Sequence, residues 1–430
     1  MDLKPTKPLS GFIELTPIQQ RCFDVCVNRM QNVLRGAGYN RIDLPAIERA
    51  EVLTDKDNWD EIETQMFLFQ KADTKMGLRY DGTVGLSRYV AGHLNGLVFP
   101  FRAYQFARNY RGERPQKGRY REFYQMDIDI LGIENLSENY DAEIVATLLR
   151  VYDSISEYVG GVCVKIGNRR FWNAMFEYLE LDEKQCRESF ILIDKRDKIK
   201  DFQDALAEII GNDKAQIIED VFNLGYKTFK DKSENLSKAI TEMDEFMEIL
   251  KSMGINNAEI DVSIMRGHSY YTGIVFEFFS TKFPELPAIG GGGRYENLAS
   301  KFSKTKIVGV GASVGISRLM VALMDDNKID LTEFEKNVDV AVLVMGKQNV
   351  QYAMGIVSKL RDNGIVAVPY LDTDKKFKNQ IEYADKIGAR YSMIIGDDES
   401  KQQKVALKNM ESGNQEIVDL DQAIKNIKVK

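Results

Sequence analysis

Arginine side chains gather in one short stretch, RNYRGERPQKGRYREF, which runs from Arg108 to Phe123. Aromatic residues are interleaved with the arginines, and a Pro-Gln-Lys-Gly segment interrupts them. Guanidinium groups held on strands form rigid forks that bind phosphate or carboxylate groups through paired hydrogen bonds. The alternative is that the arginines form cross-strand ion pairs with Glu113 and Glu122. The stretch therefore predicts either an anion-binding site or a charged hairpin.

A run of glycines, AIGGGGRYENLA, is a second candidate for contact with a ligand. Such a run could cradle a phosphate group, make a tight turn or let the backbone approach any ligand closely. No P-loop is present, because no glycine-rich turn in the chain ends in Gly-Lys-Ser or Gly-Lys-Thr. The glycine run alone leaves the kind of ligand open.

The elements that must position these residues are indicated by the flanking patterns. RAYQFARNYR and YREFYQMDIDILG are both strand-like and predict a long antiparallel hairpin that carries the arginines. Upstream, Thr16-Pro17 predicts the start of a helix that ends near Gly36. The next segment, YNRIDLPAIERAEVL, predicts a strand that Pro45 interrupts, and MFLFQKADTKMGLRY predicts two strands joined by a polar turn.

The character of the chain changes three times along its length. Residues 1–167 are rich in strand signals, 168–255 are charged and helical, and 256–330 return to strands and glycines. From about residue 336 to 430, strand and helix patterns alternate, as in VDVAVLVMG, NVQYAMGIVSKLRDNG and IVAVPYLD. This alternation predicts a small α/β domain with a mainly parallel sheet.

The chain has 430 residues, a length that predicts two or three globular domains. Its formal net charge is only -7. No apolar run approaches the roughly 20 residues that span a membrane. The N-terminal MDLKPTKPLSGF lacks the apolar core of a signal peptide. Neither a zinc pattern nor a disulfide framework is formed by the four cysteines, Cys22, Cys26, Cys163 and Cys186. We therefore expect a cytoplasmic protein with no membrane partner, whose mild acidity leaves room for a local basic site.

Four segments together resemble the histidyl-tRNA synthetase family. YRGERPQKGRYREFYQMDIDILG resembles its motif 2, MRGHSYYTG its histidine-specific segment, GVGASVGISRL class II motif 3, and LRYDGTVGLSRY its amino-acid-binding strand. The stretch through Pro45 would be motif 1. The resemblance covers nearly the whole chain, and the motifs occur in the family's order.

This resemblance implies an α+β fold. A class II antiparallel-sheet catalytic core would comprise residues 1–167 and 256–330, with a helical insertion domain at 168–255. Residues 336–430 would form a C-terminal α/β anticodon-binding domain. The family is homodimeric with motif 1 at the interface, so a second copy of the chain is an expected partner.

The resemblance also implies a two-step reaction, in which ATP is a substrate and Mg²⁺ a cofactor. The carboxylate of L-histidine attacks the α-phosphate of ATP, and a terminal ribose hydroxyl of histidine tRNA then attacks the histidyl-adenylate. Both steps gather negative charge, so fixed cations are the main catalytic requirement. Arg111 matches the motif 2 arginine that bridges the α-phosphate and the amino-acid carboxylate. Arg266 matches the catalytic arginine on its opposite side, and Arg318 the motif 3 arginine that holds the γ-phosphate. Magnesium ligands are not assigned.

Two groups of residues match positions that bind histidine in the family. The positions at the α-amino group are Asp81, Gly82, Thr83 and Gln125. The positions around the imidazole are Asp129, Tyr270 and Tyr271. A carboxylate that pairs with one ring N–H fixes the tautomer, and a phenol can satisfy the other nitrogen. An amino acid without these groups would leave buried polar atoms of the pocket unpaired.

The loop from Gln116 to Arg119 would contact the acceptor end of histidine tRNA, which carries an extra 5′ guanosine in this family. Lys117 and Arg119 could reach phosphates or guanine edges there. The alternative interpretation is a flexible, solvated loop.

Two departures from the family pattern keep other functions open. His268-Ser269 stands where Leu-Asp is usual, and Ser317 stands where glutamate commonly precedes the motif 3 arginine. One alternative is a non-charging paralogue that regulates ATP phosphoribosyltransferase in histidine biosynthesis. That paralogue typically lacks the anticodon-binding domain, whereas this chain has a full C-terminal α/β segment. Another is a ligase that activates a different acid, which the His268-Ser269 pair would favour.

Overall fold

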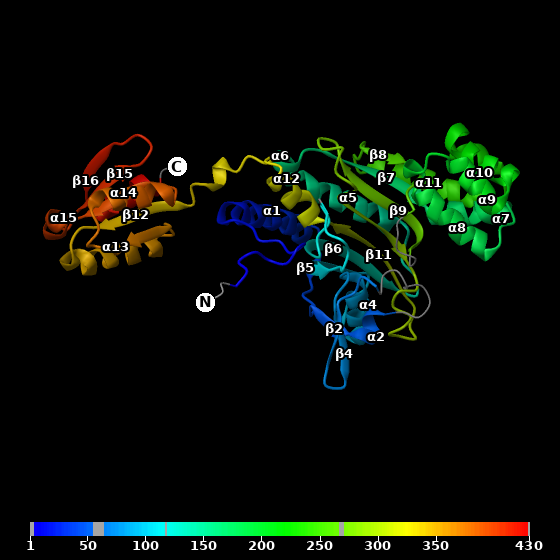
Figure 1. The fold of residues 1–430 in the computed structure, drawn as a ribbon, viewed down its shortest axis with the longest axis horizontal. Coiled ribbons are helices and arrows are strands. Elements are labelled where there is room, and N and C mark those ends of the chain that lie inside the picture. Colours follow the sequence, from blue (N-terminus) through cyan, green and yellow to red (C-terminus); the bar gives the residue numbers. More distant parts are fainter. Residues whose placement is uncertain (1–3, 55–63, 117, 266–270, 429–430) are drawn as a thin grey trace. The chain divides into compact units, whose positions relative to one another are not determined.

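The computed structural model describes residues 4–54, 64–116, 118–265 and 271–428 (Figure 1). The chain divides into two compact units. One comprises Met1–Glu14 with Phe23–Ile329, and the other Leu15–Cys22 with Asp330–Lys430. None of the helices in the described part of the chain is long and apolar enough to cross a membrane.

The first helix, α1 (Pro17–Gly36), begins and ends where its sequence predicts. Its apolar residues recur every four positions, so they share one face. That face is fully buried and contains Cys22, Cys26, Met30 and Leu34. Gly38 follows the helix with φ 81°, a conformation that glycine adopts readily. Both cysteines are buried thiols.

An eight-stranded sheet forms the centre of the first unit. In spatial order its strands are β1 (Asn40–Arg41), β5 (Phe101–Tyr110), β6 (Glu122–Ile133), β11 (Ile307–Val314), β10 (Gly290–Tyr295), β9 (Tyr271–Ser280), β7 (Val162–Asn168) and β8 (Ala258–Ile260). The outermost pairings, β1 with β5 and β7 with β8, are parallel, and the others are antiparallel. The predicted arginine-bearing hairpin is confirmed as β5–β6.

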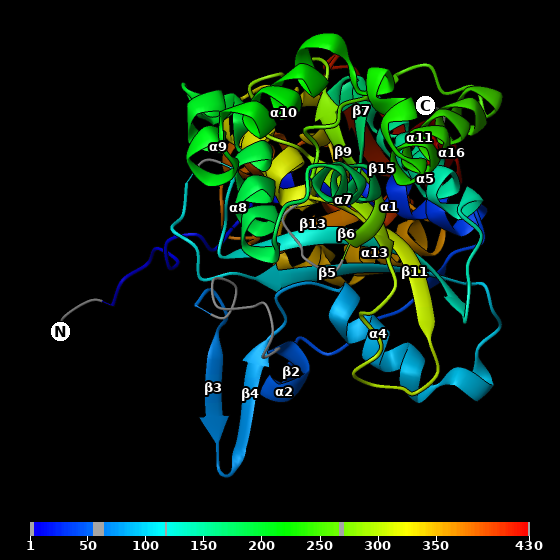
Figure 2. The same ribbon diagram turned by 90° about the vertical axis from the view of Figure 1, so that its right-hand side faces the viewer.

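Smaller elements complete this unit around the sheet. α5 (Asn139–Asp153), which α6 (Ser156–Val159) follows, packs on the sheet through a buried apolar face. The predicted strands upstream are confirmed as a three-stranded sheet of β2 (Ile47–Arg49), β4 (Thr74–Leu78) and β3 (Leu68–Lys71). β3 and β4 project from the rest of the unit (Figure 2). The short α2 (Ala50–Leu53) follows β2, and α4 (Thr83–Gly92) follows β4.

A helical segment connects β7 to β8. It contains α7 (Arg169–Tyr178), α8 (Glu183–Asp194), α9 (Phe202–Ile210), α10 (Asn212–Leu224) and α11 (Glu234–Ser252). The side chain of Asn168 accepts a hydrogen bond from the backbone N–H of Arg170 and so caps α7. Trp172 and Phe176 of α7 are buried in the segment's aromatic core. The helices gather beyond the β7–β8 side of the sheet in Figure 1.

The glycine run is neither a turn nor a phosphate-binding loop, because it forms strand β10 inside the sheet. A Cβ atom at Gly292 would lie 2.1 Å from the backbone oxygen of Gly311. A Cβ at Gly293 would lie 2.8 Å from the backbone oxygen of Ile274. The glycines are therefore required by the close approach of neighbouring strands.

The second unit has a five-stranded sheet in the order β13 (Ala367–Tyr370), β12 (Val338–Val344), β14 (Ala389–Ile395), β15 (Val405–Asn409), β16 (Gln415–Val418). The first three strands are parallel to one another, as the sequence predicts, whereas β15 is antiparallel to β14 and β16 is antiparallel to β15, so the sheet as a whole is mixed. The strand–helix alternation on which the prediction was based lies upstream of the C-terminal hairpin β15–β16 and did not include it. α15 (Asp397–Gln402) joins β14 to β15.

Both faces of this smaller sheet are covered, which explains the unbroken apolar run of β12. Val340, Val342 and Val344 pack with α13 (Val350–Asp362) and α16 (Leu420–Lys428). Ala341 and Leu343 point to the other face and pack with α14 (Phe377–Lys386).

Candidate active site

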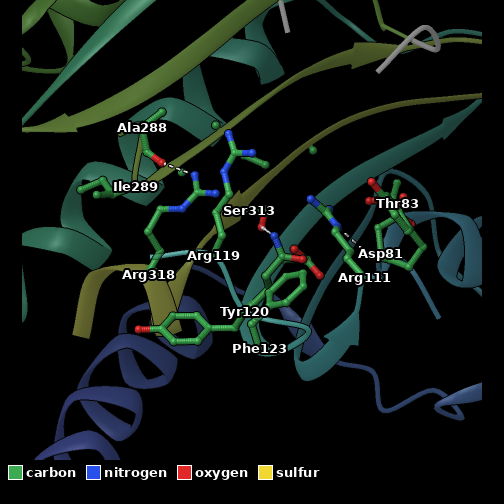
Figure 3. Close-up of a pocket in the computed structure, with 18 of the residues that line it drawn as sticks. Asp81, Thr83, Arg111, Arg119, Tyr120, Phe123, Ala288, Ile289, Ser313 and Arg318 are labelled. Atoms are coloured by element: carbon green, nitrogen blue, oxygen red, sulfur yellow. Dashed lines mark hydrogen bonds between the residues drawn. The ribbon is translucent and has the colours of Figure 1, made fainter. Parts of the chain in front are cut away.

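A cavity of about 370 Å³ opens in the first unit, between the β5–β6 hairpin, the start of α4 and strands β9, β10 and β11 (Figure 3). It brings together most of the residues that the resemblance singled out. The residues matched to histidine binding that line it are Asp81, Thr83, Gln125, Asp129 and Tyr271. The matched arginines that line it are Arg111, Arg119 and Arg318. The other matched positions Arg266, Tyr270 and Lys117, together with the His268-Ser269 pair, lie outside the described residues.

Two of the matched positions lie beside the cavity and do not line it. Gly82 precedes α4, and a Cβ atom there would lie 2.5 Å from Oδ2 of Asp127. Glycine therefore lets the α4 terminus approach the carboxylates of β6. Gln116 is exposed and forms a two-residue bridge with Arg119 in the loop between β5 and β6.

Arg111 is held between two aromatic rings. Its guanidinium carbon lies 4.3 Å from the centre of the Tyr80 ring and 5.2 Å from that of Phe123. Its Nε donates a hydrogen bond of 3.4 Å to the backbone oxygen of Tyr80. Cation–π contacts of this kind fix the plane of a guanidinium group while its outer N–H groups stay available. Arg111 is therefore placed beside Asp81 and Thr83, as Figure 3 shows.

Ion pairs account for two other arginines of the hairpin region, one across the strands and one within the connecting loop. Arg108 lies 3.4 Å from Glu122, and Arg119 lies 3.6 Å from Glu113. Both arginine side chains are about half exposed, so such pairs contribute little to stability. The ion-pair interpretation of this stretch therefore holds for Arg108 and Arg119. Anion binding by Arg111 stays a prediction.

Arg318 connects two segments that border the cavity. Its Nη1 donates to the backbone oxygen of Ala288 at 2.8 Å, and its Nε donates to that of Gly118 at 3.1 Å. The arginine lies in a π-helical turn, η4 (Ser317–Val321), and π-helical turns occur frequently at functional sites. In Figure 3, Arg318 lies near Ala288 and Ile289, at a distance from Arg111.

Ser317, which stands where the family commonly has glutamate, has a structural role. Its side chain is fully buried, and its Oγ accepts a 2.8 Å hydrogen bond from the backbone N–H of Tyr124 on β6. This bond ties the η4 turn to the hairpin strand. Ser317 therefore supports the position of Arg318 through the backbone.

Three carboxylates lie at the α4 side of the cavity, of which Asp127 and Asp129 are buried and Asp81 is half-buried. Asp81 lies just before the first turn of α4, and its Oδ1 accepts a 3.0 Å hydrogen bond from the backbone N–H of Val84. Its Oδ2 is buried without a hydrogen-bond partner among the described residues, and so is Oδ2 of Asp127. Asp129 is the third and is 1% exposed. Buried acceptors without a donor are costly, so this cluster is suited to a ligand that brings N–H groups and positive charge.

The pKa values of these carboxyl groups reflect their surroundings. Burial raises the pKa of Asp127 to about 6, while a hydrogen bond from Ser313 opposes the rise. Burial raises the pKa of Asp129 to about 8, opposed by a hydrogen bond from Tyr295. The pKa of Asp81 is also raised, again mainly by burial. A cationic ligand would favour the ionised form of all three groups.

Asp127 and Tyr295 are pocket residues that the sequence interpretation missed. A signal for Asp127 was present, because alternate residues of a strand share one face and Gln125, Asp127 and Asp129 alternate in YQMDID. The signal for Tyr295 was absent, because its partner Asp129 lies 166 residues away in the chain. On the same face, the amide nitrogen of Gln125 donates to Oγ of Ser313 at 2.8 Å.

Comparison with known proteins gives matches along nearly the whole chain. A family model described as Histidyl-tRNA synthetase matches residues 11–319, and one described as Anticodon binding domain matches 339–430. A histidine–tRNA ligase from Finegoldia magna is 37% identical, over 98% of this chain and 99% of its own.

Solved structures agree with these matches. The histidyl-tRNA synthetase of Nostoc sp. PCC 7120 superposes with a TM-score of 0.84 at 29% identity, over 99% of both chains. A Bacillus halodurans protein described as an ATP phosphoribosyltransferase regulatory subunit/histidyl-tRNA synthetase shares the fold at 20% identity, with a TM-score of 0.73 over 88% of this chain and 97% of its own. The predicted fold, an antiparallel core sheet followed by an α/β domain, is confirmed.

Proposed function

The chain belongs to the histidyl-tRNA synthetase family, and on this premise we propose that it joins L-histidine to histidine tRNA at the expense of ATP. The enzyme is a class II aminoacyl-tRNA synthetase. It forms histidyl-adenylate and pyrophosphate, and then transfers the histidyl group to the 3′ end of the tRNA.

One observation carries this proposal: a single cavity combines a buried carboxylate cluster with fixed guanidinium groups. The carboxylates suit the α-ammonium and imidazole of histidine. Arg111 lies beside them, where a carboxylate and an α-phosphate would meet, and it would stabilise the charge that develops there. Arg318, which lies farther from Asp81 than Arg111 does in Figure 3, would hold the γ-phosphate.

We propose that Asp127 binds the α-ammonium group of histidine together with Asp81, because both carry a buried oxygen that has no donor among the described residues. Replacing Asp127 with asparagine should raise the KM for histidine about 10-fold or more, since hydrogen bonds to charged groups are the stronger ones. The KM for ATP should stay within about 2-fold, and steady-state pyrophosphate exchange measures both. Equal changes in the two KM values would argue against this role.

Magnesium is proposed to arrive with ATP. Among the described residues no three His, Cys, Asp or Glu side chains gather in a way that could hold a metal ion. Mg²⁺ is usually bound through one or two carboxylates together with substrate phosphates and water. Glu113 lines the cavity and is the carboxylate that we propose for this purpose. Bound Mg²⁺ would supply neutralisation of phosphate charge.

The loop between β5 and β6 is proposed to meet the acceptor end of tRNA. Arg119 is half exposed, and among the described residues its side chain has one ion-pair partner, Glu113, which RNA phosphate could replace. Replacing Lys117 and Arg119 together with alanine should lower the charging of tRNA that carries the extra guanosine. Initial charging rates with and without that nucleotide should become similar. Persistence of the original preference would show that the loop does not recognise it.

A homodimer is also proposed, since the family resemblance places motif 1 at a dimer interface. The small sheet next to motif 1 exposes three large apolar side chains: Ile47 is 49% exposed, Leu68 42% and Phe69 41%. Burial of such side chains is typical of interfaces between subunits. Analytical ultracentrifugation should give twice the chain mass, and Phe69→Glu should shift the sedimenting species toward the monomer.

Pyrophosphate exchange with each amino acid in turn tests the proposed function directly. Only histidine should support exchange, and purified histidine tRNA should then be charged. Exchange with another acid would favour the alternative ligase, and no exchange at all would favour the regulatory paralogue. We further propose a cytoplasmic location, where charged tRNA is used in protein synthesis.

A further inference from the structure

Tyr295 and Asp129 form a buried pair inside the candidate histidine pocket. The phenol of Tyr295 donates a 2.8 Å hydrogen bond to Oδ1 of Asp129. Each side chain is only 1% exposed, and both line the cavity. The two residues belong to β10 and β6, which are separated by strand β11. The bond therefore crosses an intervening strand.

Two glycines of β11 make this crossing possible. Gly309 is the register partner of Tyr295, and Gly311 is the register partner of Asp129. A Cβ atom at Gly309 would lie 2.4 Å from the Tyr295 ring, and a Cβ at Gly311 would lie 2.0 Å from Oδ1 of Asp129. Any side chain at either position would displace one member of the pair. The two glycines thus leave space over β11 in which the phenol and the carboxylate can meet.

We propose that Tyr295 is a positioning residue for amino-acid selection, which fixes the Asp129 carboxylate so that it can accept an imidazole N–H. This inference deepens the proposed function and rests on it. Tyr295 belongs to a strand inside the sheet, and its phenol holds Oδ1 of Asp129. The orientation of the carboxylate, and with it the direction of its second oxygen, is thereby fixed. A buried acceptor held in this way favours a ring N–H and disfavours amino acids that lack one.

The electrostatics of the pair agree with this role. The hydrogen bond from Tyr295 opposes the rise that burial imposes on the pKa of Asp129, and so favours the accepting, ionised form. The register neighbours of Asp129, Ala103 on β5 and Gly311 on β11, carry no charge. Among the described residues, the titratable groups whose charges act on Asp129, or feel its charge, are Asp81, Asp127, Tyr295 and Tyr39.

The primary test is Tyr295→Phe in the full-length enzyme, measured by histidine-dependent pyrophosphate exchange. The KM for histidine should rise about 10- to 100-fold, the range expected when a hydrogen bond to a charged group is lost. Both kcat and the KM for ATP should stay within about 3-fold. The matched control is Tyr104→Phe, because Tyr104 is a buried phenol on β5 that bonds Gln31 at 3.4 Å and does not line the cavity. A similar rise in the control, or equal rises for histidine and ATP, would overturn the proposal.

A double-mutant cycle tests whether Tyr295 acts through Asp129. Asp129→Asn alone should raise the KM for histidine, and adding Tyr295→Phe should then raise it no further. Additive effects would show that Tyr295 does not act through this carboxylate. Gly311→Ala provides a second route to the same defect that leaves the phenol in place. It should also raise the KM for histidine selectively, and an unchanged value would contradict the proposed geometry.

The pH profile separates positioning from a merely structural role. Asp129 must be ionised to accept, so histidine binding is lost as pH falls through its pKa. Loss of the phenol donor should raise that pKa, so the acid limb of kcat/KM for histidine should move to higher pH in Tyr295→Phe. An unmoved limb would overturn the proposal. Failure of the parent enzyme to exchange pyrophosphate with histidine would instead refute the proposed function itself.

Discussion

Arg111→Ala is expected to slow histidine-dependent pyrophosphate exchange by about 10²–10³-fold, which is the effect of removing one fixed donor from a developing charge. The aromatic rings of Tyr80 and Phe123 hold this guanidinium group beside the carboxylate cluster. Because the contact strengthens as charge accumulates on the α-phosphate, the loss should appear mainly in kcat. Single-turnover adenylate formation measures it directly.

The hairpin offers a matched control for this prediction. Arg108 lies on β5, and its guanidinium carbon is 4.9 Å from the centre of the Tyr124 ring. Unlike Arg111, it pairs with Glu122 and does not line the cavity. Arg108→Ala should therefore change the exchange rate by less than about 3-fold, as expected for a half-exposed ion pair. If both variants are equally slow, the defect lies in the hairpin and not in the site. Arg266→Ala is expected to match Arg111→Ala, on the resemblance alone.

Elements with a strong local signal could be predicted from the sequence. α1 and the β5–β6 hairpin follow from periodicity, caps and turn residues that lie close together in the chain. The four-segment division of the chain stays a prediction. The glycine run shows where local reasoning fails, because its need for glycine comes from the backbones of β9 and β11 on either side.

The candidate site shows the same limit at the level of single residues. Asp127 could have been found by counting alternate positions along β6, whereas Tyr295 required the pairing of β6, β11 and β10 to be known. The role of Ser317 was equally hidden, since its partner is a backbone N–H on strand β6, far away in the sequence. Long-range register is set by the whole core, so no window of the sequence contains it.

Removal of residues 336–430 is expected to abolish most tRNA charging while histidine-dependent pyrophosphate exchange stays measurable. All described residues that line the cavity fall between Gln65 and Arg318, so the tail contributes none of them. The tail matches an anticodon-binding domain, and proteins read RNA mainly through unpaired bases. Charging should fall by more than about 100-fold if several base contacts are lost, since each stacked base contributes about 1–3 kcal/mol.

Within the tail, we expect Phe377 to stack on a base of the anticodon loop. It is 39% exposed at the start of α14, near the carboxyl end of parallel strand β13, and Lys375, Lys376 and Lys378 surround it in the sequence. Ligands of α/β sheets bind at such carboxyl ends, and an exposed ring among lysines suits single-stranded RNA. Phe377→Ala should therefore lower kcat/KM for tRNA about 5- to 100-fold and leave pyrophosphate exchange unchanged.

The control for this variant is Ile417→Ala, because Ile417 is an apolar residue that is 58% exposed on β16, at the other edge of the same sheet. It should charge tRNA like the parent, since no cluster of lysines surrounds it in the sequence. Equal losses in the two variants would mean that any exposed apolar residue of the tail affects charging, and Phe377 would have no special role. Normal charging by the truncated chain would refute anticodon recognition by the tail altogether, because the first unit alone would then select its tRNA through the acceptor end.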